Sequence, residues 1–367
     1  MNARDFDHAR VGSISLALIL LAALVAGCGG GGGTTAVATA PTDLDEPATG
    51  TLRVFAYEDS VTPEMMAPFE EQNPDLEVKT ATFDSDAEAA AKLSGGFKAD
   101  VVEVCLDEAE PLLQRQLLRP LDTAGIPEWS QIAFNDSKGV QQKGKPIMVP
   151  LSAGPEGVIV NTDEVDAAAV DSYADLYDPA YAGRTALEGD YALPPIAITA
   201  LSMGIEDPMN MDAAELGEVG DYMDEHRSQF RALWGSDSDL VNLFKSGEIV
   251  IADGNTGVAK RTEEAGVPVE WIEPKEGTLA WVCGFGITSK ADNLDAAYRL
   301  INWQASPQGQ AIRGANGYVV TNPAAVPLIP AADRDTADPS SLQNAIPETY
   351  PPLYDDWVRT FEAFRAG

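Results

Sequence analysis

From Thr51 onward the chain alternates short apolar segments with amphipathic ones, and this alternation constrains its fold more than any other feature. Thr51–Tyr57, Leu76–Thr82 and Asp100–Cys105 have the composition and length of strands, whereas Pro63–Gln72 and Ala87–Leu93 have helical character. A strand–helix–strand–helix–strand succession folds into a mainly parallel sheet covered by helices. The sequence therefore predicts an α/β protein.

The alternation continues toward the C-terminus. We expect further strands at Gly157–Asn161, Thr185–Glu188, Glu248–Ala252, Val269–Ile272 and Leu279–Thr288. We expect further helices at Asp171–Tyr177, Asp212–Leu233, Asp237–Ser246, Leu294–Gln304, Pro307–Arg313 and Asp355–Arg365. The chain has 367 residues, which is more than a single core usually supports, so two lobes are expected.

The N-terminus has the pattern of a bacterial lipoprotein signal. An apolar run, Val11–Ala26, leads through Gly27 to Cys28, and five glycines follow. The run is too short to cross a bilayer comfortably, and small residues before a cysteine are typical of lipoprotein processing. We expect a signal peptide at 1–28, a lipid on Cys28 and a flexible tether at 29–50. The alternative is an ordinary secretory signal with an incidental cysteine.

An anchor of this kind predicts a location outside the cytoplasmic membrane, in the periplasmic or extracytoplasmic space. There ATP and reduced nicotinamides are not available, so most metabolic enzyme classes are excluded. The sequence has two histidines, His8 and His226, which argues against a histidine metal site or a Ser-His-Asp triad. Motifs for hydrolases and for phosphate-binding loops are also missing. We expect no catalysis, no cofactor and no metal.

The chain carries a formal net charge of −34. Such a charge repels nucleic acid and anionic lipid and attracts small cations. Adaptation to a saline environment is an alternative explanation, because salt shortens the range of electrostatic attraction. Adjacent acids such as Glu108 and Glu110 are expected on the solvated surface, since a chain with 58 acidic residues produces such pairs by chance.

Polar and aromatic residues follow several of the predicted strands. In open α/β sheets, ligands bind beyond the carboxyl ends of strands. The candidate ligand-binding residues at these positions are Tyr57, Glu58, Asp107, Asp190, Tyr191, Asp253 and Asn255. The alternative for each acid is that it caps the next helix. Trp281 lies within a predicted strand, and the Cys283–Gly284 pair after it indicates a place where backbones approach closely.

Three segments resemble the polyamine-binding proteins that serve ABC importers. Asp171–Arg184 is similar to the family's W-x-D-L-W-x-P-x-Y-x-G stretch, and Pro274–Trp281 to its P-K-E-G-x-x-x-W segment. Gly317–Asn322 resembles its G-Y-x-x-x-N motif. The similarity runs from about Thr51 to the end of the chain.

This resemblance implies a two-lobe periplasmic-binding-protein-like fold of type II, in which hinge-joined lobes close on a ligand in the cleft between them. Lobe 1 would comprise 51–156 and 281–322, and lobe 2 would comprise 157–280. The segment 323–367 would pack on lobe 2.

The resemblance also assigns roles to single residues. Trp281 and Tyr318 match aromatic ligand contacts, and Tyr57 keeps a ring where the family has a tryptophan. Asn255 stands where the family has another tryptophan, and Cys283 replaces its main ligand acid. Because Cys105 and Cys283 both match positions that line the site, we predict a disulfide between them. The alternative is two buried free thiols.

The implied function is binding of spermidine or putrescine for an ABC importer. The partners would be its permease and ATPase subunits, and the membrane through Cys28; a monomer is expected. An ammonium removed from water needs a carboxylate or several acceptors, which a cysteine does not supply. Another cationic or zwitterionic solute, such as an amino acid, betaine or choline, is therefore an alternative. An envelope hydrolase and a sensory binding module are remoter alternatives.

Overall fold

The computed structural model describes residues 37–41, 46–83, 86–137, 139–189 and 191–367. The predicted signal peptide, the lipidation site Cys28 and the candidate site residue Asp190 lie outside these ranges. The predicted tether lies partly inside them. There, Ala38 is buried and forms a bridge to Leu121, and Ala48 donates a backbone hydrogen bond to the Asn73 side chain.

Lobe 1 is a sheet flanked by helices, and the chain enters it twice. Its strands are β1 (Gly50–Ala56), β2 (Leu76–Thr82), β3 (Val101–Cys105) and β4 (Leu118–Arg119), with a small pair β5 (Gln141–Gln142) and β6 (Lys145–Pro146). Its helices are α1 (Pro63–Gln72), α2 (Asp86–Ser94), α3 (Glu110–Gln114), α8 (Leu294–Ala305), α9 (Pro307–Ala315) and α10 (Arg334–Ala337).

Lobe 2 repeats this plan with other elements. Its strands are β8 (Thr185–Glu188), β9 (Phe230–Trp234), β10 (Ile251–Asn255) and β11 (Val269–Ile272). Its helices are α4 (Leu193–Ser202), α5 (Ala213–Glu225), α6 (Asp237–Ser246), α7 (Thr256–Glu264) and α11 (Tyr354–Ala366).

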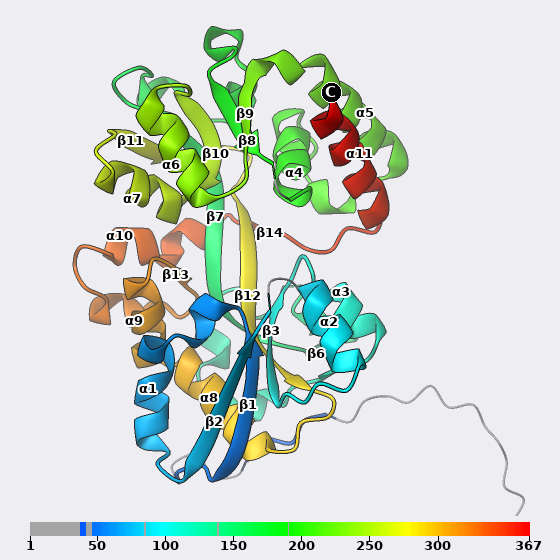
Figure 1. Ribbon diagram of the computed structural model, residues 1–367, viewed down its shortest axis with the longest axis vertical. Helices are drawn as coiled ribbons and strands as arrows, with labels where there is room; N and C mark the ends of the chain where they lie inside the picture. Colours follow the sequence, from blue (N-terminus) through cyan, green and yellow to red (C-terminus); the bar gives the residue numbers. More distant parts are fainter. Residues whose placement is uncertain (1–36, 42–45, 84–85, 138, 190) are drawn as a thin grey trace, which may run out of the picture. The chain divides into compact units, whose positions relative to one another are not determined.

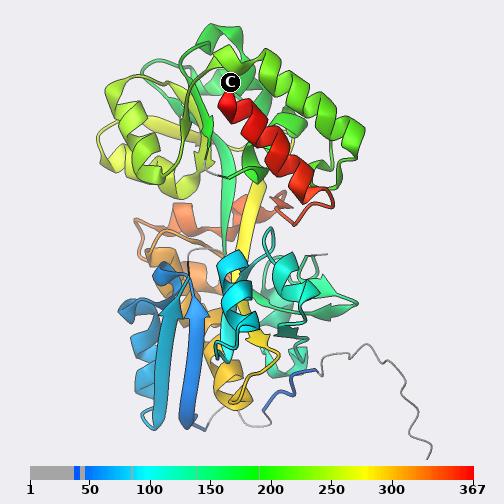
Figure 2. The same cartoon turned by 45° about the vertical axis from the view of Figure 1, so that its right-hand side comes forward.

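Two long antiparallel strands, β7 (Val149–Asn161) and β12 (Leu279–Thr288), run side by side from one lobe into the other (Figures 1 and 2). They occupy the centre of the strand order β2-β1-β3-β12-β7-β10-β8-β9. The pairings of β1 with β2 and β3, and of β8 with β9 and β10, are parallel. The short strands β13 (Val319–Val320) and β14 (Ile346–Pro347) add to β7 and β12. The predicted α/β fold with two lobes is confirmed.

The helix expected at Asp212–Leu233 is wrong in its second half. α5 begins after Asp212, whose carboxylate caps the helix by accepting hydrogen bonds from Ala214 N and Glu215 N, and it ends at Glu225. A short turn follows, and β9 then pairs with β8 in the sheet. Trp234 is buried there and donates a hydrogen bond to Asp253. Tertiary pairing therefore overrides the local helical character of this segment.

The C-terminal segment divides between the lobes. Ala325, Ile329 and Ala337 are buried in a small cluster with Val320 of β13, so this part packs on lobe 1 rather than on lobe 2 as expected. The last helix, α11, buries its aromatic face in the lobe 2 core beside α4 and α5. That face consists of Trp357, Phe361 and Phe364. Burial of each ring contributes on the order of 2 kcal/mol.

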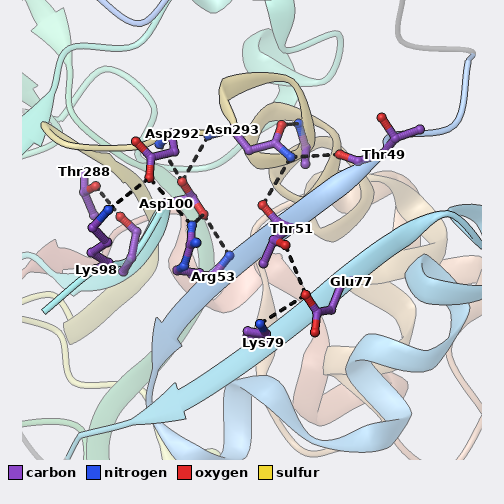
Figure 3. A network of polar contacts seen from close by, with 12 residues as sticks. Thr49, Thr51, Arg53, Glu77, Lys79, Lys98, Asp100, Thr288, Asp292 and Asn293 are labelled. Carbon is purple, nitrogen blue, oxygen red and sulfur yellow. Dashed lines mark hydrogen bonds and ion pairs between the residues drawn. The ribbon is translucent and has the colours of Figure 1, made fainter.

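A polar network fixes the amino end of β3 (Figure 3). The Asp100 carboxylate accepts hydrogen bonds from the backbone N–H groups of Arg53 at 2.9 Å, Asp292 at 2.7 Å and Asn293 at 3.1 Å. The Arg53 guanidinium lies 3.5 Å from the same carboxylate. This network ties the turn before α8 to β1 and β3, and thereby holds the lobe 1 sheet in register with β12.

Candidate functional site

A cavity of about 320 Å³ lies where the carboxyl ends of strands from both lobes meet the crossing strands β7 and β12. Lobe 1 contributes the ends of β1 and β3, and lobe 2 contributes the ends of β8, β9 and β10. The lining residues are Tyr57, Cys105, Asp107, Glu108, Glu156, Glu188, Tyr191, Pro194, Trp234, Ser236, Asp237, Asn255, Trp281, Cys283 and Glu348. Six of them are carboxylates, and none of the described lining residues is a lysine, arginine or histidine.

The crossing strands place an aromatic wall in this cavity. Trp281 on β12 lies opposite Gly154 on β7, and a Cβ at Gly154 would come within 2.2 Å of the indole ring. Glycine is therefore required for the ring to lie against the β7 backbone. Tyr318 packs edge-on against Trp281, with ring centroids 6.1 Å apart. Tyr57, which follows β1, packs edge-on against Phe83, and its backbone N–H donates to the Glu103 carboxylate.

A disulfide lies in the cavity wall. Cys105 at the end of β3 and Cys283 on β12 are directly opposed in the antiparallel register, and their sulfurs are bonded. The next residue, Gly284, stands at an irregularity in the pairing of β12 with β7, where a Cβ would lie 1.9 Å from the Val149 carbonyl oxygen. Backbones therefore approach closely here, and the disulfide holds the carboxyl end of β3 to the crossing strand.

Three of the lining acids are nearly inaccessible to solvent. Asp107 is 7% exposed, Glu156 is 5% exposed and Glu348 is 2% exposed. Asp107 Oδ1 and Glu348 Oε1 have no hydrogen-bond partner among the described residues. The Tyr191 hydroxyl is equally buried and equally without a partner in this part of the chain. Polar atoms in this state are costly unless a ligand or water satisfies them.

Burial and mutual repulsion favour the neutral forms of these acids. Burial, reinforced by Glu108, raises the pKa of Asp107 to about 7. Burial and the charge of Asp253 raise the pKa of Glu156 to about 8. Burial, with Asp107 and Glu156 nearby, raises the pKa of Glu348 well above its usual range. The cavity therefore favours either protons or a positively charged ligand.

The structure brings most of the predicted site residues together. Tyr57, Asp107, Tyr191, Asn255 and Trp281 line the cavity, as do both cysteines. Three further residues, Glu58, Asp253 and Tyr318, are not part of the lining. Glu58 is exposed, and Tyr318 contributes by packing against Trp281.

Asp253 is not among the residues that line the cavity. It is buried, and its carboxylate accepts hydrogen bonds from Trp234 Nε1 at 2.7 Å and from Glu188 N at 3.1 Å. These bonds hold Trp234 and Glu188, two residues of the lining, so Asp253 supports the lobe 2 wall of the cavity.

Several lining acids were not expected from the sequence. Glu108 was assigned to the solvated surface, and Glu156, Glu188, Asp237 and Glu348 were not considered. Two of these had usable signals in the sequence. Glu156 is a single acid inside an otherwise apolar segment, and Glu188 lies at the carboxyl end of a predicted strand, where other candidate site residues were identified. Asp237 begins α6, where an acid is ordinary at a helix N-terminus, and it pairs with Arg261. Glu348 has no local signal.

The fold and the cavity define a class of protein: two α/β lobes joined by crossing strands, with a ligand cavity between them. The model of the bacterial extracellular solute-binding protein family matches residues 64–339, and the chain belongs to this family. Among the described residues, no helix has the length and apolar character needed to cross a membrane, and no group of acids, cysteines and histidines is arranged to hold a metal ion.

Characterised relatives and solved structures agree with this assignment. The chain is 27% identical over 321 residues to the putrescine-binding periplasmic protein PotF of Escherichia coli, covering 82% of this chain and 83% of that protein. It is 25% identical over 304 residues to the spermidine/putrescine-binding periplasmic protein 1 of Haemophilus influenzae, covering 81% and 82%.

The structure also resembles that of the spermidine/putrescine ABC transporter substrate-binding protein PotD from Streptococcus pneumoniae. The TM-score is 0.71 at 22% identity, and the match covers 86% of this chain and all of that one. This likeness supports the two-lobe fold.

Proposed function

We propose that the protein binds polyamines such as putrescine and spermidine and delivers them to the permease of an ABC importer. One observation carries the proposal: the cavity is lined by six carboxylates and four aromatic rings, with no basic residue among its described lining. Ammonium groups pair with carboxylates, and the methylene chain between them packs against ring faces.

The distribution of the acids favours an extended molecule with charges at separate points. Asp107 and Glu108 follow β3 in lobe 1, whereas Glu188 ends β8 in lobe 2. Glu156 lies on the crossing strand β7, and Glu348 follows β14. A molecule with an ammonium group at each end therefore contacts both lobes at once, which rewards closure of the cleft.

In this chain Cys283 stands at the position of the family's main ligand acid, and the acids of the cavity can supply the negative charge that the cysteine lacks. The position held by Cys283 contributes a disulfide, while negative charge comes from other strands and from Glu348. The ligand charge is thus balanced by a rearranged set of carboxylates.

Titration calorimetry of the purified protein tests the proposal. Putrescine and spermidine are expected to bind, whereas N-acetylputrescine, which keeps one ammonium group, is expected to bind at least about tenfold more weakly, since loss of one buried charge pair costs more than 1.4 kcal/mol. Betaine, choline and common amino acids, which carry their charges in other arrangements, are tested as alternative ligands. Binding of one of these without binding of any polyamine would assign the site to a different solute.

The location and the partners are part of the proposal. We propose that the protein works outside the cytoplasmic membrane, held by a lipid on Cys28, with permease and ATPase subunits as partners. Metabolic labelling with a fatty acid is expected to mark the wild-type protein and not Cys28→Ser. Labelling of both would exclude this cysteine as the lipid attachment site.

A further inference from the structure

The acids that line the cavity present an electrostatic problem. Asp107, Glu156 and Glu348 are each more than nine-tenths buried, and they line a cavity without a basic residue in its described lining. Two of their oxygens, Asp107 Oδ1 and Glu348 Oε1, are buried and have no hydrogen-bond partner among the described residues. Three such groups do not all remain ionised close together without compensation, because each unpaired buried charge costs several kcal/mol.

We propose that Asp107, Glu156 and Glu348 hold protons while the cavity is empty and release them as ligand ammonium groups take their places. Binding is then an exchange of cations for protons. Each carboxylic O–H bond that breaks leaves its electron pair on the carboxylate, its proton passes to the solvent buffer, and the carboxylate pairs with an N–H donor of the ligand. The inference rests on the proposed polyamine function and deepens it.

The surroundings of the three acids support this exchange. The groups around Asp107 are Glu108, Glu348 and the Tyr191 hydroxyl. Glu156 faces Asp253 and the Asn255 amide, and the buried Tyr173 hydroxyl donates to its backbone carbonyl.

Glu348 lies near both other acids and near the hydroxyls of Tyr173 and Tyr191. Tyr354 lies near Tyr191, Asp107 and Glu108. All of these charged or titratable neighbours are acidic or neutral. Repulsion and burial consequently act together to raise the pKa values of the three acids.

The exchange gives polyamine binding a distinct pH dependence. Putrescine has only primary ammonium groups, which titrate near pH 10, so between about pH 6 and pH 8.5 its protonation stays nearly constant while that of the protein changes. Because the ligand binds the ionised carboxylates, affinity rises with pH, by up to about tenfold per pH unit for each proton released. Spermidine, with more ammonium groups, is expected to release more protons than a ligand with a single ammonium group.

Calorimetry in buffers of different ionisation enthalpy measures this exchange directly. Putrescine is titrated into the purified protein near pH 6.5 in several such buffers, and the slope of observed heat against buffer enthalpy counts the protons. We expect at least one proton released per bound putrescine. Glu156→Gln and Glu348→Gln keep the side-chain shape, and each is expected to lower the count. Glu270→Gln, on the exposed side of β11, is the matched control and is expected to leave it unchanged.

The outcomes separate the two proposals. Putrescine binding with a heat that is independent of the buffer overturns the exchange and leaves the polyamine function intact. Failure of putrescine and spermidine to bind overturns both. The number of protons released is measured on the wild-type protein, so it tests the exchange even where a substitution affects folding.

Discussion

The two ends of β3 carry buried carboxylates in opposite circumstances. Asp100, at the amino end, is 1% exposed and accepts three backbone hydrogen bonds with the Arg53 guanidinium beside it. Asp107, two residues beyond the carboxyl end, is 7% exposed and has an oxygen without a partner among the described residues. The same burial thus stabilises the fold at one end and opposes it at the other, because only one carboxylate has its donors built in.

This contrast separates the buried acids whose oxygens are satisfied within the fold from those that we propose to pair with a ligand. Asp253 resembles Asp100, since its oxygens accept from Trp234 and Glu188. Glu156 and Glu348 resemble Asp107, because burial and acidic neighbours raise their pKa values. A binding site retains such unsatisfied groups at a cost in stability, which the bound cation offsets.

The largest expected effect on the free energy of unfolding is at Asp100, at the amino end of β3. Replacing Asp100 with alanine leaves three backbone N–H groups and the Arg53 charge without their acceptor, so unfolding free energy should fall by about 3–5 kcal/mol. Urea unfolding followed by circular dichroism measures it. Asp292→Ala is the control: its side chain is 62% exposed and its contacts to Arg53 and Lys98 are longer than 3.6 Å, so a loss below about 1 kcal/mol is expected. Equal losses in both variants would show that the network does not depend on Asp100.

The next effect concerns the link between β3 and β12. The Cys105–Cys283 disulfide closes a loop of 178 residues, so the double variant Cys105→Ser, Cys283→Ser should lose about 2–4 kcal/mol of unfolding free energy. Intact-mass analysis after alkylation, with and without reductant, first establishes the oxidation state. Two alkylated cysteines in unreduced protein would remove the basis of this prediction. Each single variant, Cys105→Ser or Cys283→Ser, also breaks the bond and is expected to lose about as much unfolding free energy as the double variant.

For Asp107, beyond the carboxyl end of β3, we expect the opposite effect: its replacement should raise the free energy of unfolding. Burial and Glu108 raise the folded-state pKa of Asp107 to about 7, above the ordinary value near 3.9 of an unfolded aspartate. The protonated carboxyl favours the folded state. The stability that it contributes is therefore fully present below about pH 4 and is lost as pH rises through about 7. Asp107→Asn should therefore stabilise the ligand-free protein by about 1–3 kcal/mol near pH 8, with little change near pH 4.

Unfolding measured at several pH values checks this prediction. Glu270→Gln again controls for the general relief of negative charge on this acidic chain, because Glu270 is exposed. A gain of the same size in the control would assign the effect to net charge rather than to burial of Asp107.

Much of the fold was predictable because its signals are local. Pro63–Gln72 and Leu76–Thr82 carry their periodicity within ten residues, and the structure has α1 and β2 with these bounds. Phe230–Trp234 failed as a prediction, since the segment becomes a strand through its pairing with β8. Where the deciding partner is distant in the chain, local composition is a poor guide.

The site was predictable to the extent that it follows from strand ends. Tyr57, Asp107 and Asn255 were expected there, since a parallel sheet gathers such residues. Glu348 could not be expected. It enters the cavity because its backbone N–H donates to Ala280 of β12, an interaction that a C-terminal segment makes only in the folded protein.

The smallest expected effect concerns putrescine affinity, and it compares the contribution of the Trp281 ring with that of the carboxylates. In Gly154→Ala, the added methyl carbon would lie 2.2 Å from the Trp281 ring, so the ring must move away from β7. Putrescine affinity should fall by about three- to tenfold, because the ring contact contributes about 1 kcal/mol while the carboxylates stay in place. Gly217→Ala is the matched control, since a Cβ there meets no atom within 4 Å and Gly217 lies in α5. Calorimetry that finds unchanged affinity in Gly154→Ala would show that charge alone holds the ligand.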